Sequence, residues 1–356
     1  DVYKRQAMWG HIVDHPDATS EQLVDYCDYL LRYATSDDED MIRDADSSIS
    51  RLEASGDSQG ALLRLRWMQI SDQSDLIPSA VSRVHDELIE KAADDKAKSA
   101  RLSKLARTLE AMQLDADAEK VYREAAEAHV AGSVDLALFL ATKSAPKTDE
   151  ALAIADNLND SGKAIESATV AATVLMSSSL EPDEVSRRRN TIMKTQSEHP
   201  SHTGLALATS GMLCYEGRYR DAIEILREVL QRNPNEAEAM NILAFALIAV
   251  GDADEAYKTI NRAIGIEGPS QEYLDTRAVA LTELQRLDEA LEDLEQLVNW
   301  DPQNTSYRLH HAKAHLRAGN PQRARMSWDV AVANDVWTRP MTTFDMRTRE
   351  DLSNEF

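Results

Sequence analysis

The sequence predicts an all-α, right-handed solenoid of stacked antiparallel helix pairs. The main evidence is a fixed period, because residues of one class recur every 34 positions through the C-terminal part of the chain. Composition agrees, since the 356 residues include only 12 glycines and 10 prolines. No stretch alternates apolar and polar residues over the length that is typical of a strand. A solenoid grows by adding one helix pair to the next, so this chain length does not require a single large core.

The period is clearest at one position that is alanine in four successive copies. A second position, twelve residues earlier, is always small, which would let the two backbones of a helix pair approach closely. A third position, five residues before the alanine, is glycine in three copies, as expected for a turn that needs a positive φ. In chain order, the alanines are Ala222, Ala256, Ala290 and Ala324, the small residues are Ser210, Ala244, Ala278 and Ala312, and the turn residues are Gly217, Gly251, Gln285 and Gly319.

These positions together resemble the tetratricopeptide repeat, whose period is also 34 residues. The runs 240–244, 260–264 and 274–278 are similar to repeat arrays in large bacterial proteins. The resemblance implies protein–protein interaction and brings no catalytic residues with it. The fourth copy departs from the pattern, with Arg308, His311, His315 and Pro321 at positions that are usually apolar or aromatic. The resemblance covers residues 203–336 as the copies 203–236, 237–270, 271–304 and 305–336.

The rest of the chain is also helical in its periodicity. We expect degenerate helical repeats over 7–98 and closer relatives of the repeat over 99–202, the clearest being 99–132 with Ala106 and Ala118. Thr19 and Gln22 form the pattern of a capping box, which predicts a helix through Tyr33. No flexible linker is evident, so a single continuous solenoid is expected.

The two ends of the chain have their own interpretations. Residues 1–6 resemble translated adapter sequence at the ends of metagenomic reading frames, and we interpret them as a non-native leader. The natural N-terminus and any signal peptide would then lie upstream. Residues 337–356 are predicted to be a C-terminal cap that covers the open apolar end of the fourth copy.

The net charge of −23 argues against a nucleic-acid partner, because phosphate binding needs clustered basic side chains. The one basic run, Arg187–Arg189, is interpreted as a solvated helix face. No apolar run is long enough to cross a membrane, so we expect a soluble protein, with the cytoplasm favoured. Cys27 and Cys214 lie far apart in an array of local contacts and are expected to be buried thiols. We expect a monomer or weak self-association.

A search for chemistry finds one notable group, the histidines of the fourth copy. His311 and His315 are spaced i, i+4, which places two imidazoles on one helix face, as a metal site requires. The zinc-protease pattern fails because no glutamate follows His311, and Lys313 and Arg317 nearby would repel a cation. We therefore expect no metal, no cofactor, no catalytic residue and no enzymatic activity.

The expected partner-binding groove is formed by the first helix of each pair. Its charge changes from acidic in the middle to basic at the C-terminal end, which suggests a peptide with a basic centre and an acidic end. Ordinary solvated side chains are the alternative explanation. The candidate groove residues are Glu238, Asn241, Phe245, Glu272, Asp275, Thr282, Lys313 and Arg317.

Two classes of function follow from the sequence. The first is a non-enzymatic interaction scaffold that binds a protein or peptide in the concave groove. The second is a recognition or regulatory module of a larger enzyme or of a secretion or envelope protein, whose catalytic part would lie upstream. The sequence before residue 7 would distinguish the two classes.

Overall fold

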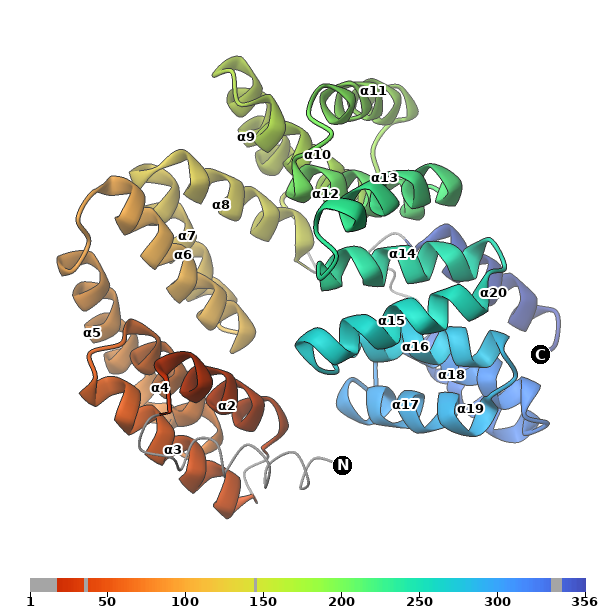
Figure 1. Cartoon of the computed structure of the whole chain (residues 1–356), viewed down its shortest axis with the longest axis horizontal. Coiled ribbons are helices and arrows are strands. Elements are labelled where there is room, and N and C mark those ends of the chain that lie inside the picture. Colours follow the sequence, from red (N-terminus) through yellow and green to blue (C-terminus); the bar gives the residue numbers. More distant parts are fainter. Residues whose placement is uncertain (1–17, 35–37, 144–145, 334–340) are drawn as a thin grey trace. The chain divides into compact units, whose positions relative to one another are not determined.

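The computed structural model describes residues 18–34, 38–143, 146–333 and 341–356. Over these ranges the chain consists of α-helices, joined by short turns, with one 3-10 helix, η1 (Ser74–Leu76), and no strand (Figure 1). The expected leader at 1–6 lies outside the described residues, as does the first part, 337–340, of the expected C-terminal cap. The fold class predicted from the sequence is thereby confirmed.

The described residues divide into two compact units, one up to Phe139 and one from Leu140 on. The first unit opens with the predicted capping box, in which the Thr19 hydroxyl accepts from the amide of Gln22 and the Gln22 side chain accepts from the amide of Thr19. Its helices are α2 (Ser20–Tyr33), α3 (Glu39–Ala54), α4 (Ser58–Ile70), α5 (Ile77–Glu90), α6 (Asp95–Ala111) and α7 (Asp115–Ala128), while α8 (Val130–Thr142) spans the boundary.

In the first unit, α6 and α7 form the helix pair expected over 99–132. Ala106 and Ala118 are fully buried where the two helices meet, together with Leu102 and Leu105. Small residues at the contact let the backbones come close, as the sequence indicates. The side chain of Gln69 on α4 donates to the carbonyl of Met112 and so ties this pair to the preceding helices.

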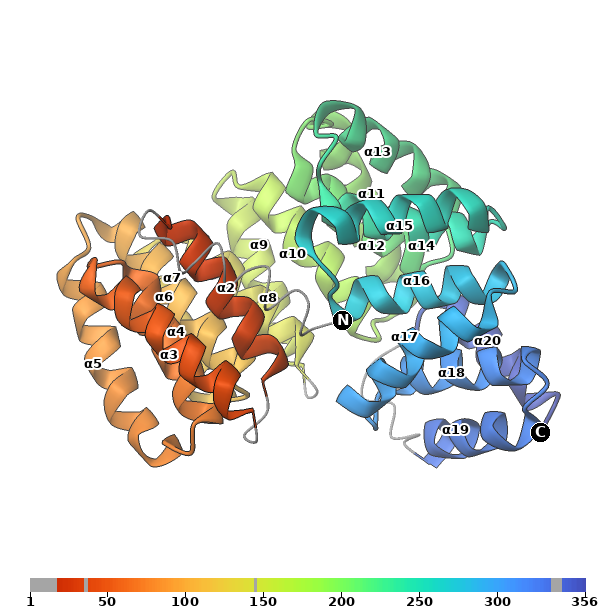
Figure 2. The same cartoon turned by 60° about the horizontal axis from the view of Figure 1, so that its bottom comes forward.

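The second unit contains the four regular helix pairs (Figures 1 and 2). The first helices of these pairs begin at Thr203, Ala237, Gln271 and Thr305, which are 34 residues apart. Successive first helices contact one another along the array. The helices of the unit are α9 (Thr148–Asp160), α10 (Ala164–Ser177), α11 (Pro182–Glu198), α12 (Thr203–Tyr215), α13 (Tyr219–Arg232), α14 (Ala237–Ala249), α15 (Ala253–Glu267), α16 (Gln271–Glu283), α17 (Leu287–Trp300), α18 (Thr305–Arg317), α19 (Pro321–Ala333) and α20 (Thr343–Ser353).

The recurring alanines mark the contact inside each pair. Ala222, Ala256, Ala290 and Ala324 are all 0% exposed, and so are the four small residues that precede them by twelve positions. A side chain larger than a methyl group would push the two helices apart at these points. The period in the sequence therefore records a packing requirement inside the scaffold.

The turns within the pairs explain the recurring glycine. Gly217, Gly251 and Gly319 have φ of 78°, 91° and 74°, in the left-handed region that a residue without a Cβ adopts at little cost. Gln285 takes φ 61° at the equivalent position of the third copy. The backbone geometry is thus kept where the glycine is missing, at some conformational cost.

The C-terminal helix α20 packs against α18 and also reaches α12. Its C-terminal end lies on the last helix pair, where Leu352 is buried with Leu309, Ala312 and Ala331. Its N-terminal end extends to the first regular pair, since the Thr343 hydroxyl donates to the carbonyl of Tyr215 over 2.9 Å. The sequence does not indicate this second contact.

Candidate functional site

The surface formed by the first helices α12, α14, α16 and α18 is the candidate site, and we call it the inner surface. Part of it is covered by the N-terminal turn of α20, which lies next to these helices in Figures 1 and 2. The ring of Phe344 lies edge-on to that of Phe245, with centroids 5.5 Å apart. Lys313 places its ammonium group 5.3 Å from the centroid of the same phenylalanine, in cation–π geometry. Phe344 is thus an aromatic anchor in the inner surface.

Next to this anchor, a buried charge network joins three helices. His310 on α18 lies between two carboxylates: Nδ1 is 2.7 Å from Asp275 Oδ1 on α16, and Nε2 is 3.0 Å from Asp345 Oδ1 on α20. Burial alone would lower the pKa of His310, but the two carboxylates outweigh it and raise the pKa to about 10. The imidazole is therefore positively charged at neutral pH.

Asp345 is further held by three hydrogen-bonding side chains. Burial opposes its ionisation, but His310 and the hydroxyls of Thr342 and Ser306 lower its pKa below the usual range. The Ser306 hydroxyl donates to Asp345 Oδ2 over 3.1 Å, and the amide of Asp345 donates to the Thr342 hydroxyl over 3.0 Å. The carboxylate is thus charged, and side chains of the same chain already supply its hydrogen-bond donors.

The basic end of the predicted groove is paired inside the chain. Glu283 on α16 accepts from Lys313 Nζ at 3.0 Å and from Arg317 Nη1 at 2.9 Å. Both cations lower the pKa of Glu283 against the opposing effect of burial. Arg317 also donates to the carbonyl of Thr282. An acidic end of a peptide would have to compete with Glu283 for these two side chains.

The other candidate groove residues differ in their exposure. Thr282 is expected from the sequence to be exposed, but it is only 2% exposed and its hydroxyl donates to the carbonyl of Ala278 within its own helix. Helix α16 turns this position toward the core, so that expectation is wrong. Glu238 and Glu272 are exposed at the starts of α14 and α16. Desolvation and the neighbouring Glu236 and Glu267 raise the pKa of Glu238.

Asn241 lies on the same helix as Glu238, one turn further on. Its side chain is half-buried, and Asn241 Oδ1 is a buried acceptor for which the described residues supply no donor. A buried polar atom without a partner is uncommon in folded proteins. A donor from a bound molecule would satisfy it.

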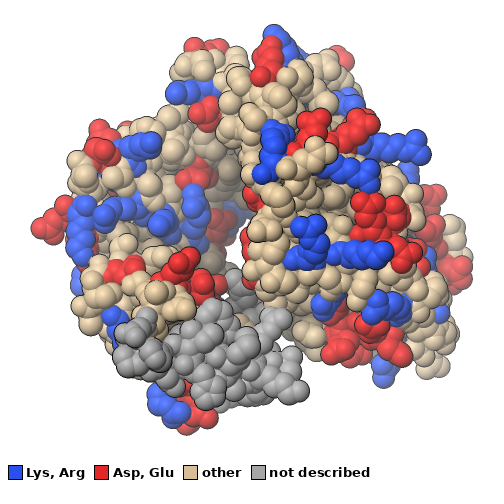
Figure 3. All heavy atoms as spheres, in the orientation of Figure 1, with Lys and Arg blue, Asp and Glu red and all other residues tan. Residues whose placement is uncertain are grey.

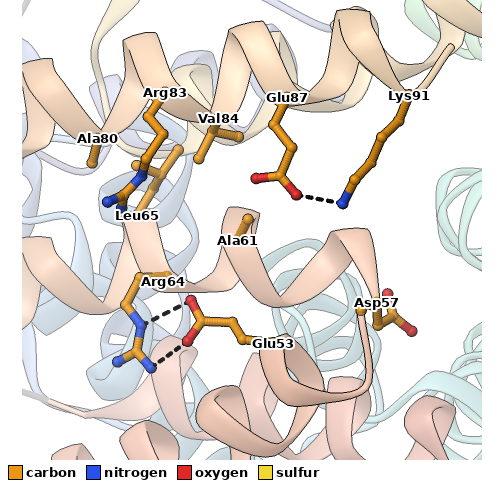
Figure 4. A pocket seen from close by; sticks show the side chains of 11 residues that line it. Glu53, Asp57, Ala61, Arg64, Leu65, Ala80, Arg83, Val84, Glu87 and Lys91 are labelled. Carbon is orange, nitrogen blue, oxygen red and sulfur yellow. Dashed lines mark hydrogen bonds and ion pairs between the residues drawn. The ribbon is translucent and has the colours of Figure 1, made fainter.

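A separate pocket of about 380 Å³ lies in the first unit between α3, α4 and α5 (Figure 4). Its lining is polar and mixed in charge. Arg64 pairs with Glu53 on one side, and Lys91 pairs with Glu87 on the other. The close-up shows Arg83 and Glu87 projecting from α5 towards α4. The acids and bases of this pocket largely neutralise each other, and the geometry indicates no particular ligand.

The surface charges are also mostly arranged in pairs. On the face shown in Figure 3, basic and acidic side chains are intermingled and do not form one patch of a single sign. Each arginine of the run Arg187–Arg189 has an acidic partner. Arg188 is 9% exposed and bridges Asp156 and Glu184, so its interpretation as part of a solvated face is wrong.

Comparison with known families decides what the helix pairs are. The family described as tetratricopeptide repeat matches residues 214–279 and again 276–335. Residues 214–335 are tetratricopeptide repeats. The two matched stretches contain all four of the key alanines. Tetratricopeptide repeat proteins bind protein or peptide partners, and this chain is accordingly an interaction scaffold.

One curated relative is similar to part of this chain. Cellulose synthase operon protein C of Pseudomonas fluorescens (strain SBW25) is 28% identical over 148 residues. The match covers 38% of this chain and 11% of that protein. The chain thus corresponds to a small part of the relative's length.

Solved structures of other proteins also resemble this chain. A chain of the APC/C hetero-tetramer Cut9–Hcn1 is 13% identical, with a TM-score of 0.51 over 92% of this chain and 69% of that one. Yeast Tom70 is 15% identical, with a TM-score of 0.46 over 99% of this chain and 87% of that one. The first of these likenesses supports the helical-repeat fold. Among the residues that the structure describes, no helix is long and apolar enough to span a membrane.

Proposed function

We propose that the inner surface binds a segment of a partner protein, and that α20 occupies part of that binding surface. The observation that carries the proposal is the way α20 is held. An aromatic side chain is seated against Phe245, and a carboxylate is bound by the buried His310. A helix whose apolar side chains lie in a groove is one of the recurring ways in which proteins bind a peptide.

The uncovered part of the surface favours a basic segment. Glu238 and Glu272 are exposed at neighbouring helix starts, and the pKa of Glu238 is raised by desolvation and by nearby glutamates. A lysine or arginine of a partner would relieve this repulsion. Asn241 Oδ1 offers an acceptor beside it that lacks a donor among the described residues. The acidic end of the peptide expected from the sequence is less well supported, because Glu283 already pairs with Lys313 and Arg317.

The test uses a photo-crosslinking amino acid in the full chain, at position 241 on the inner surface or at position 224 on α13. Glu224 is exposed on a second helix and gives a matched position outside the inner surface. We expect position 241 to capture a partner and position 224 to capture none. Capture at position 224 alone would contradict the proposal.

A charge-reversal experiment tests the basic segment separately. We expect the double substitution Glu238→Lys and Glu272→Lys to abolish partner capture at position 241. The matched control is Glu224→Lys with Glu228→Lys, which reverses two exposed charges on α13. Equal loss in both double variants would show that only the net charge matters, and the proposed contact would be wrong.

A second candidate function is an interaction module within a larger protein. The match to 11% of Cellulose synthase operon protein C favours it, because the similar stretch is a small part of a long relative. We propose that the module acts without catalysis in either case. Sequencing of the full gene tests this candidate, and an open reading frame that also encodes a catalytic domain would support it.

A further inference from the structure

We propose that Glu295, His311 and His315 form a binding site for a divalent transition-metal ion of the zinc class. One possible ligand atom from each residue lies within 4.8 Å of the others. The two histidines lie on α18 and the glutamate lies on α17, so an ion would join the second helix of the third pair to the first helix of the fourth. Two imidazoles and one carboxylate are a known zinc ligand set that leaves a fourth position open.

The two imidazoles are placed as ligands would be. Their ring centroids are 4.4 Å apart, at an interplanar angle of 76°. His311 is 8% exposed and His315 is 1% exposed. His311 Nε2 and His315 Nδ1 are both buried, and neither has a hydrogen-bond partner among the described residues. Two unsatisfied nitrogens at one buried place are costly unless something binds there. A metal ion would accept both lone pairs.

Ser327 on α19 orients the first of these rings. Its hydroxyl oxygen is 2.6 Å from His311 Nδ1. When Nδ1 donates this hydrogen bond, the lone pair lies on Nε2, the atom that has no partner. A hydrogen bond of this kind, made by the ring nitrogen that faces away from the ion, commonly fixes the tautomer and direction of a metal-binding histidine.

Lys313 and Arg317, which argue against a metal ion when only the sequence is considered, pair with another residue in the structure. Lys313 is two residues beyond His311, about 200° around the helix, and it pairs with Glu283 and stacks on Phe344. Arg317 pairs with the same glutamate. The sequence could not reveal Glu295 as the third ligand, because that residue comes from the preceding helix pair.

Arg323 competes with a metal ion for the carboxylate of Glu295. Arg323 Nη1 lies 3.9 Å from Glu295 Oε1, and its side chain is 68% exposed. A metal ion would take over the carboxylate, and the exposed arginine could turn into solvent. Replacement of Arg323 should therefore strengthen metal binding, whereas replacement of a ligand should weaken it. These opposite signs distinguish a specific site from general attraction to an acidic protein.

The experiment titrates the untagged full chain with Co²⁺, followed by visible absorption, and with Zn²⁺, followed by calorimetry and by the melting temperature. We expect one ion per chain, the visible bands of tetrahedral cobalt and a higher melting temperature. Glu295→Gln should weaken binding at least about tenfold, and Ser327→Ala about 10–100-fold. Arg323→Gln should tighten binding.

The matched control is Glu292→Gln, which removes another exposed charge from the same helix. It should bind Co²⁺ as the unaltered chain does. His315→Gln should lose the cobalt bands, with its helix content checked by circular dichroism. No binding by the unaltered chain at millimolar Zn²⁺ would overturn the proposal. Equal weakening by Glu292→Gln and Glu295→Gln would also overturn it.

Discussion

His310 Nε2 lies 3.0 Å from Asp345 Oδ1, which links the last regular helix pair to the C-terminal helix that follows it. The same imidazole contacts Asp275 through its other nitrogen. One buried cation thus joins α16, α18 and α20. The contact gives α20 a definite place on the inner surface, and its chemistry leads to the first prediction.

The attachment of α20 should depend on pH. His310 has a pKa of about 10 in the folded chain, above its usual 6.5, so its contribution to stability is complete below about pH 6.5 and is lost as the pH rises towards 10. Asp345 has a lowered pKa, so its contribution is present above about pH 3.8 and is lost as the pH falls further. We expect amide exchange in α20 to be slowest between about pH 4 and 6.5, after correction for the intrinsic pH dependence of exchange.

Asp345→Asn checks the cause of this dependence. It keeps the size of the side chain and removes the charge, so the loss of protection between about pH 6.5 and 10 should become smaller. Asp351→Asn, at an exposed position of the same helix, is the control and should keep the profile of the unaltered chain. If both variants keep that profile, His310 is not the titrating group.

Phe344→Ala should loosen α20 and expose the inner surface. The ring packs on Phe245, His310 and the ammonium group of Lys313, so its loss should cost about 2 kcal/mol, less than for a fully buried phenylalanine. Protection of the α20 amides should fall by roughly 30-fold, and a partner that binds the same surface should bind more tightly. Met346→Ala is the control, since Met346 is 50% exposed. Unchanged partner affinity in Phe344→Ala would place the partner elsewhere.

Gln285→Gly should stabilise the second unit. Gln285 has φ 61° at a turn where three equivalent residues are glycine. Relief of the left-handed penalty, less the extra chain entropy of glycine, should give about 0.5–1 kcal/mol. Gly251→Ala is the reverse experiment at φ 91° and should destabilise the chain. Denaturant unfolding of both variants measures the change, and a decrease in stability for Gln285→Gly would contradict the argument.

Ala118→Leu should destabilise the first unit by about 1–3 kcal/mol, because the added atoms have no room between α6 and α7. Ala116→Leu in the same helix is exposed and should change stability by less than about 0.5 kcal/mol. Thermal unfolding of the two variants gives the comparison. Equal effects would mean that Ala118 does not have the role that the key alanines have in the regular pairs.

The sequence predicts the architecture well because that architecture repeats. A fully buried alanine between two helices imposes the same requirement in every copy, so Ala222 and Ala256 stand out as a period in the amino-acid sequence alone. The capping box at Thr19 is predictable for a similar reason, since it depends only on residues three apart. The division of the chain into domains stays a prediction. The boundary near residue 140 between the two compact units falls inside the predicted segment 99–202.

The site is harder to predict because its contacts are long-range. Counting along the repeat places Thr282 in the groove, but the side chain is buried and its hydroxyl donates within its own helix. The contact between His310 and Asp345 joins residues 35 positions apart, and no local pattern encodes it. The candidate metal ligand Glu295 is hidden from the sequence for the same reason. Helix packing that repeats produces a periodic pattern in the sequence and can be predicted from it, whereas a contact that occurs only once produces no such pattern.

Each compact unit contains one buried cysteine, whose reaction with a thiol reagent can report the opening of that unit. Cys27 lies in the first unit at 0% exposed and Cys214 in the second at 4%, and burial raises the pKa of both thiols to about 12. A thiol reagent can reach either sulfur only when the surrounding helices separate. The rates at which the two sulfurs are labelled, resolved by peptide mapping, would therefore time the opening of each half of the scaffold independently, without any engineered probe.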